Sequence, residues 1–232
     1  MTRFLHGANL GRARQLPMSK SPEKAEPRGA SHPGRHLQDF YAVVIGVALV
    51  LAVEEIIDSS DASSPIDWTS LPLFLSFALL AFSYYHGSVR YLDVMYSDEG
   101  PELSRLRIYS DLFIGAIDTM LVIALSILIS RPIYFLTVLT IMFVLEVLRV
   151  ATLKRFLPSE QIFPLETDFM VIHLALIPIF AGIFFVARSV GSAEAERLVV
   201  GIPLLVLIVV RSIFSYRRSF ELYFPQQTQR SD

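Results

Sequence analysis

Seven ionisable side chains of this 232-residue sequence stand inside long apolar runs or at their ends. They are His86, Arg90, Asp118, Glu146, Arg149, His173 and Arg211. A charge is costly in an apolar medium, so such groups either pair with one another or hold or move an ion. Carboxylates bind cations or protons, guanidiniums hold carboxylates, and an imidazole titrates near neutral pH. These residues are therefore the first candidates for a functional site.

The apolar runs that carry them have the length of membrane-spanning helices. The chain is 53% hydrophobic and only 18% charged, with a mean hydropathy of +0.52. Six runs of about 17–22 residues match the thickness of a bilayer core, and their continuous apolar character favours helices over strands. We predict an all-α, polytopic membrane protein. Its six-helix domain covers 38–218, with spans at about 40–57, 71–87, 112–130, 132–153, 169–190 and 198–214.

Outside this domain the sequence predicts two tails, a disordered basic one over 1–37 and a short one over 219–232. Contact of the basic tail with anionic lipid is the alternative for it. If both tails are cytoplasmic, only Arg131, Arg188 and Arg197 of the 20 Lys and Arg residues fall outside. Basic residues are enriched on the cytoplasmic side of membrane proteins. We therefore expect cytoplasmic termini in a bacterial inner (plasma) membrane, with the lipid bilayer as the main partner.

With this topology, all seven candidate residues fall in the inner half of the membrane. Asp118 lies about 10 Å deeper than Asp111 at 1.5 Å per helical residue, and Glu146 reaches a similar depth. Arg149 follows Glu146 by three residues and shares its face of the helix. Two interpretations stay open, a polar vestibule open to the cytoplasm or a set of paired charges that hold the helices together. His86 and Arg90 stand in "YYHGSVRY", where the tyrosines suit an interfacial aromatic belt.

The first predicted helix has small residues at helical spacing and two adjacent acids at its outer end. Small residues let helices approach closely, so this helix could line a pore between subunits or pack as an ordinary apolar helix. The residues that would line such a pore are Ala42, Ile45, Gly46, Leu49 and Val53. Glu54 and Glu55 could lie in the headgroup layer, or form an acidic ring that attracts cations in an oligomer.

The sequence disfavours an enzyme. It contains no cysteine, no His-Glu-x-x-His helix, no Gly-x-Ser-x-Gly elbow and no phosphate-binding loop. Glu54 and Glu55 lack the arginine that would complete the Glu-Glu-x-x-x-Arg motif of prenyl-protein proteases, because position 59 is Ser. We expect no catalytic residue, no metal site, no cofactor and no nucleic-acid partner.

The stretches "HLQDFYAVVIGVALVLAVEEI" and "YYHGSVRYL" resemble the first two helices of the six-helix bacterial and lysosomal potassium channels. That family carries an Arg-x-x-x-Phe-Ser-Asp motif before an apolar helix that ends in an acid. Phe40 and Glu55 match its spacing, whereas His36 replaces the arginine, and Tyr41 and Ala42 replace Ser-Asp. The resemblance implies a tetramer with a pore lined by the first helix and constricted at Ile45 and Leu49.

Taken together, these features predict a channel-like or transport protein that forms a homo-oligomer and conducts a monovalent cation. A non-transporting membrane sensor or scaffold, with the polar cluster of the inner leaflet, is the alternative. An oligomer with the first helix around its symmetry axis would favour the channel, and a lipid-facing first helix in a monomer would exclude it.

Overall fold

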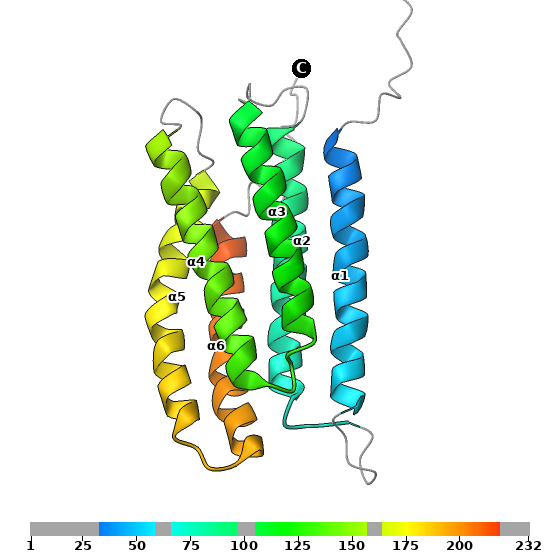
Figure 1. The fold of residues 1–232 in the computed structure, drawn as a ribbon. Coiled ribbons are helices and arrows are strands. Elements are labelled where there is room, and N and C mark those ends of the chain that lie inside the picture. Colours follow the sequence, from blue (N-terminus) through cyan, green and yellow to red (C-terminus); the bar gives the residue numbers. More distant parts are fainter. Residues whose placement is uncertain (1–32, 59–65, 97–104, 157–163, 219–232) are drawn as a thin grey trace, which may run out of the picture. The chain divides into compact units, whose positions relative to one another are not determined.

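A computed structural model describes residues 33–58, 66–96, 105–156 and 164–218, and all regular structure in these ranges is α-helical. The predicted all-α architecture is thus confirmed, while most of the two predicted tails, 1–32 and 219–232, lies outside the described residues. The helices are shown in Figure 1. They are α1 (Pro33–Asp58), α2 (Leu71–Met95), α3 (Arg105–Ser126), α4 (Pro132–Phe156), α5 (Pro164–Arg188) and α6 (Ala193–Arg218).

Two helices differ from their predicted spans in a way that bears on the site. α2 continues eight residues past Gly87, so Tyr91 is helical and not in a loop. α3 begins at Arg105, which places Arg107 and Asp111 one turn apart on the same helix. It ends at Ser126, whose hydroxyl donates to the carbonyl of Ile123, and a turn follows to Ser130. Capping of the last carbonyls by side chains and tight turns is a normal way for a helix to end.

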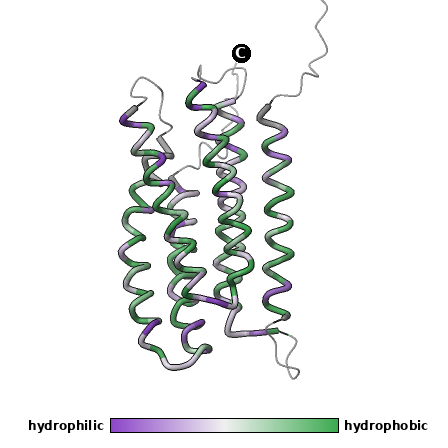
Figure 2. Tube along the Cα trace, viewed as in Figure 1, coloured by the Kyte–Doolittle hydropathy of each residue, from purple (hydrophilic) through white to green (hydrophobic). Residues whose placement is uncertain are grey.

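Five helices of the described residues are long and apolar enough to cross a membrane. They are α1, α3, α4, α5 and α6. α2 is of similar length but is not among them, since its second half carries polar residues such as His86 and Arg90. Figure 2 shows the apolar character along most of each helix. The chain is therefore compatible with an integral membrane protein.

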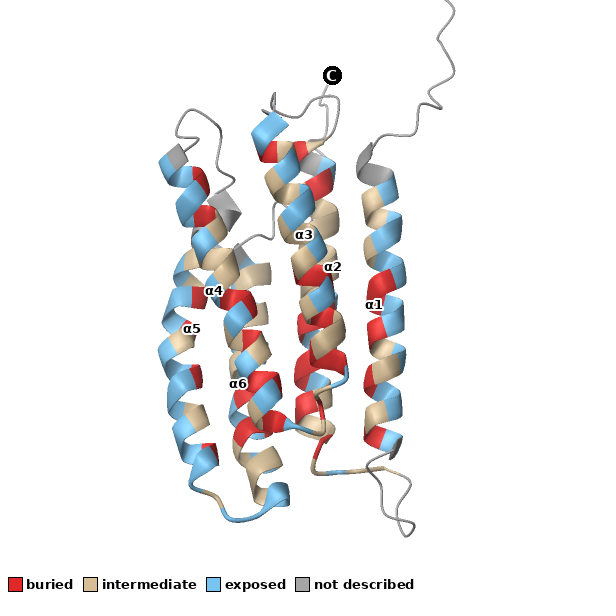
Figure 3. Ribbon diagram, in the orientation of Figure 1, coloured by how far each residue is buried: buried red, intermediate tan, exposed pale blue. Residues whose placement is uncertain are grey.

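The outward surface of the helices is apolar as well. Large exposed hydrophobic side chains occur on all six, for example Val43 on α1, Phe113 on α3 and Phe185 on α5. Exposed positions alternate with buried ones around each helix in Figure 3. Soluble monomers rarely expose contiguous apolar patches larger than a few hundred Å². An apolar surface on every helix suits contact with lipid.

The helices pack in a closed order of neighbours. α1 contacts α2 and α3, α2 contacts α6, α6 contacts α5, α5 contacts α4, and α4 contacts α3. Further contacts join α4 to α6 and α2 to α3. α1 approaches closely because Ala48 and Ala52, which have small side chains, are completely buried.

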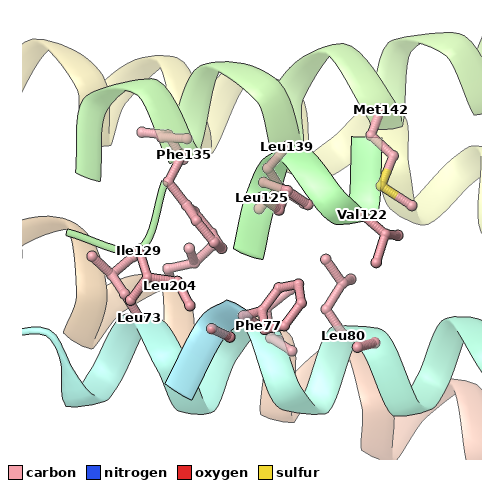
Figure 4. Packing of buried hydrophobic residues seen from close by; sticks show 14 of the residues in the cluster. Leu73, Phe77, Leu80, Val122, Leu125, Ile129, Phe135, Leu139, Met142 and Leu204 are labelled. Carbon is pink, nitrogen blue, oxygen red and sulfur yellow. The ribbon is translucent and has the colours of Figure 1, made fainter. Parts of the chain in front are cut away.

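One half of this bundle is filled by large apolar side chains, and we call it the closed half. It contains the last turns of α3, the first turns of α2 and α4, and the α6 residues that pack on them. Figure 4 shows how these side chains interlock. They are Leu73, Phe77, Val122, Leu125, Ile129, Phe135, Leu139 and Leu204. Gly201 of α6 adds to the close packing, because a Cβ there would lie 3.0 Å from Pro72.

A polar cluster ties the ends of α2 and α6 together next to the closed half. The carboxylate of Asp67 accepts hydrogen bonds from the Thr69 backbone (2.9 Å), the Thr69 hydroxyl (2.6 Å) and the Ser70 hydroxyl (2.8 Å). Arg197 Nη1 donates to Asp67 Oδ2 at 2.6 Å. Burial raises the pKa of Asp67, but these hydrogen bonds and the Arg197 charge outweigh it and lower the pKa below the ordinary 3.8. Asp67 therefore stabilises the fold while it is ionised.

Candidate functional site

The half of the bundle opposite the closed half contains a cavity of 420 Å³, and we call it the cavity half. Residues of all six helices line the cavity, from the first turns of α1 and α3 to the last turns of α2, α4 and α6. Small side chains leave this space open. They are Ser83, Gly87 and Ser88 of α2 and Gly115 and Ala116 of α3. Leu80, Met142 and Phe143 line the cavity and also belong to the apolar core.

Two carboxyl groups meet in the cavity. Asp118 of α3 is only 3% exposed, and its carboxyl group interacts with that of Glu146 of α4, beside Tyr84 of α2. Two neighbouring ionised carboxylates repel each other, and one bound proton removes this repulsion. The second oxygen of Asp118, Oδ1, is buried and has no hydrogen-bond partner among the described residues. The pair can therefore hold a proton and still offers a free acceptor.

A buried ion cluster supports Glu146 from the side. Arg149 Nε donates to Glu146 Oε2 at 3.2 Å, and Arg149 Nη1 lies 3.5 Å from Asp111 Oδ1. Asp111 Oδ2 also accepts from Arg107 Nε (3.1 Å) and from the hydroxyl of Tyr91 (2.6 Å). Arg107 is 1% exposed, so its charge depends on these partners. The cluster joins α2, α3 and α4 and fixes the position of Glu146.

Tyrosines extend the hydrogen-bonded network to α1. Tyr84 hydrogen-bonds with Tyr41 of α1, and the two rings meet edge to face with centroids 6.0 Å apart. The Tyr41 hydroxyl lies against Gly115, where a Cβ would collide with it. Glycine at this position is thus what lets Tyr41 reach into the bundle. The network runs from Tyr41 through Tyr84 to Asp118.

The other wall of the cavity holds an imidazole and a guanidinium. Arg211 Nη2 lies 3.2 Å from His173 Nε2. Arginine can only donate, so Nε2 accepts and the imidazole is neutral in this arrangement. The His173 ring stacks on Phe143 with centroids 4.1 Å apart, and Arg211 lies over the same ring at 5.7 Å. Phe143 therefore orients both side chains.

The structure brings five of the seven predicted residues to one cavity. They are Asp118, Glu146, Arg149, His173 and Arg211. The other two do not line it. The Nδ1 of His86 lies 3.1 Å from the hydroxyl of Tyr216, and Arg90 pairs with Asp93 at 3.6 Å.

The predicted residues of α1 divide between two faces. Ile45 is buried in the core of the chain, and Leu49 is half-buried. Ala42, Gly46 and Val53 are exposed, and no atom would come within 4 Å of a Cβ at Gly46. The last three residues thus share an outward surface of the single chain.

The two outer acids also separate. Glu54 is exposed, whereas Glu55 is half-buried and accepts a hydrogen bond from the hydroxyl of Ser130. Within the described residues, no group of three or more His, Cys, Asp or Glu side chains is placed to hold a metal ion.

Sequence reasoning did not single out Arg107, Asp111 or the tyrosines as members of one site. We predicted Tyr84 and Tyr91 as part of an interfacial belt, yet both line the cavity, as does Tyr41. A signal for the ion cluster was present, because Arg107 and Asp111 are four residues apart, as in a helical ion pair. This spacing indicates an ion pair only if both residues are helical, and the structure shows that α3 starts at Arg105.

No protein-family model, curated protein or solved structure matches the chain. The resemblance to the six-helix potassium channels therefore stays a prediction.

Proposed function

We propose that the protein is a six-span membrane transporter in which Asp118 and Glu146 exchange a shared proton for a cation. The observation that carries this proposal is that Asp118 and Glu146 line one cavity, where the buried Oδ1 of Asp118 has no hydrogen-bond partner among the described residues. Ionisable groups at such depth usually mark ion or proton pathways. The cavity half would face the cytoplasm, in line with the excess of basic residues at the two tails.

The position of α2 supports a count of six spans. α2 has 25 residues, as do α4 and α5, and it packs against α1, α3 and α6. Its polar residues turn toward neighbours or the cavity, as the contact of His86 with Tyr216 illustrates. A helix that is covered by others can be less apolar than one that faces lipid.

The geometry suggests how the exchange would work. A cation that binds Asp118 Oδ1 would favour ionisation of both carboxyl groups, and the shared proton would leave. The ion cluster of Arg149 and Asp111 would hold Glu146 in place during this step. The closed half blocks passage to the other side, so the proposal assigns this structure to a state open toward the cytoplasm. Release on the far side would require the closed half to part.

Flux into proteoliposomes tests the proposal. We expect uptake of Na⁺ or K⁺ driven by an outward proton gradient, and loss of this uptake in Asp118→Asn. The Asn amide can still accept from Tyr84 and donate to Glu146, but it does not ionise and therefore cannot release a proton when a cation binds. Glu54→Gln is the matched control, because it removes one carboxylate from an exposed site outside the cavity. Equal uptake by wild type and Asp118→Asn would contradict proton exchange at this pair.

An oligomeric channel is the second candidate, favoured by the exposed small residues of α1. Ala42, Gly46 and Val53 could face a symmetry axis, as the resemblance to the potassium channels implies. The chain has no cysteine, so single cysteines at these positions report only on contacts between copies. The channel predicts disulfide-linked dimers from Ala42→Cys and Val53→Cys and few from Val47→Cys, which is exposed on another face of α1. Equal cross-linking at all three sites would speak against the axis.

The paired charges of Arg107, Asp111 and Arg149 also suit a non-transporting sensor or scaffold. The flux experiment separates this alternative from transport. A folded protein that moves no ion with either a proton gradient or a membrane potential would favour the sensor or scaffold.

A further inference from the structure

The cavity reaches the flank of the bundle, which shows how a ligand could enter. Phe40 of α1 is 49% exposed and Leu112 of α3 is 42% exposed, yet both line the cavity together with the buried Asp118 and Phe143. Ala116 of α3 is likewise exposed. These rim residues are apolar, and in a membrane this flank faces lipid. An apolar molecule could therefore reach the carboxyl pair from the inner leaflet.

The size and chemistry of the cavity favour an organic ligand over a bare metal ion. Pockets for small organic molecules are about 300–1,000 Å³ and mainly apolar, and this one measures 420 Å³. A bare Ca²⁺ or Mg²⁺ ion instead needs about six or more oxygen ligands at short distance. Much of the wall is aromatic. The aromatic lining residues are Phe40, Tyr41, Tyr84, Tyr91, Tyr96 and Phe143.

Within this wall, Asp118 is the group that can bind a positive charge. Asp111 and Glu146 each contact a guanidinium, whereas Oδ1 of Asp118 has no hydrogen-bond partner among the described residues. Aromatic ring faces attract organic cations as well. Tyr84 lies beside Asp118 in this wall and interacts with it.

The charge of the cavity would stay constant if an organic cation replaced the shared proton. Two guanidiniums (Arg149 and Arg211) and three carboxyl groups (Asp111, Asp118 and Glu146) line the cavity. Exchange of one bound proton for a monovalent cation leaves the net charge of these groups unchanged. The titratable and charged groups that line the cavity around the pair are Tyr41, Tyr84, Tyr91, Tyr96, Asp111, Arg149, His173 and Arg211.

From these observations we propose that the cavity binds lipophilic organic cations, with the cationic centre at Asp118 and the apolar body against the aromatic wall. The ligand enters between α1 and α3, and one proton leaves the Asp118–Glu146 pair for each cation bound. This inference rests on the proposed proton exchange and names its substrate class.

Two hydrophobic ions of nearly equal size and opposite charge test this directly. Calorimetric titration of the purified full chain with tetraphenylphosphonium should show one site per chain and release of one proton, measured in two buffers of different ionisation enthalpy. Its affinity should rise by up to about tenfold per pH unit while the pair is protonated. Tetraphenylborate should bind at least tenfold more weakly. Tighter binding of the anion would overturn the inference and point to Arg211 instead.

Variants locate the site. Asp118→Asn should abolish saturable phosphonium binding and proton release, while Glu54→Gln should retain both. Leu112→Trp should block access at the rim and slow or prevent binding without a change of charge. If Asp118→Asn does not fold, Leu112→Trp still tests the route. Unchanged binding in Leu112→Trp, or binding without proton release, would overturn the inference, as would equal occupancy by a neutral acyl chain.

Failure of this inference can be told apart from failure of proton exchange. Na⁺ or K⁺ uptake that depends on Asp118, without any phosphonium binding, would refute the organic ligand and retain the exchange. Phosphonium binding and flux both independent of Asp118 would refute both.

Discussion

The closed half and the cavity half of this bundle hold their helices together by different means. In the closed half, Phe77, Phe135 and Leu139 are almost completely buried and fill the space between helices. In the cavity half, small residues such as Gly115 leave space, and ion pairs such as Arg107–Asp111 take over the contact. Apolar packing thus closes one end, while polar contacts leave the other end hollow and able to bind.

The largest effect should follow from breaking the ion cluster. Asp111→Ala removes a carboxylate that contacts both Arg149 and Arg107, whose side chain is 1% exposed. We expect a loss of about 3–5 kcal/mol of unfolding free energy, measured by denaturant titration in detergent. The control is Asp93→Ala, which removes an exposed carboxylate of α2. Similar stability of the two variants would show that the cluster does not hold the cavity half.

A somewhat smaller loss of unfolding free energy is expected when a buried side chain of the closed half is truncated. Leu139→Ala removes a side chain with no exposed surface and should cost about 2–4 kcal/mol. Val144→Ala on the same helix is the control, because Val144 is exposed. Thermal unfolding followed by circular dichroism measures both. A cost at Leu139 as small as at Val144 would mean that the closed half is loosely packed.

Asp67 should give a moderate and pH-dependent effect. Its lowered pKa means that its stabilisation is complete above the unfolded pKa near 3.8 and disappears as the pH falls through the lower folded value. Asp67→Asn should therefore cost about 1 kcal/mol at pH 7 and almost nothing at the lowest pH. Unfolding measured from pH 7 to pH 3 checks this. Parallel pH profiles of wild type and variant would contradict it.

The smallest effect on stability is expected at the carboxyl pair itself. Asp118→Asn keeps a hydrogen-bond acceptor for Tyr84 and gains a donor for Glu146, so unfolding should change by less than about 1 kcal/mol. The same variant should lose the proton-coupled flux. The unfolding free energy and the flux of wild type and variant should be measured on the same preparations, so that the two effects can be compared. A large loss of stability would show that Asp118 stabilises the cavity half.

Several features of the fold could be predicted from local sequence. α2 begins at Leu71 and α4 at Pro132, as predicted, because proline suits the first turn of a helix. The depth of Asp118 and Glu146 along their helices followed from a fixed rise per residue. The sequence did not predict which face of α1 carries Ile45. We had placed Ile45 at a possible pore, and in the structure its side chain is buried.

The sequence by itself determined six helices and where along five of them the polar residues lie. Only the tertiary structure decided which of those residues meet. Depth depends on position in one helix, whereas contact depends on how each helix is rotated and which helices are its neighbours. Tyr41 and Tyr84 reach Asp118 because α1 packs beside α2 and α3, and His86 turns to Tyr216 because α2 packs beside α6.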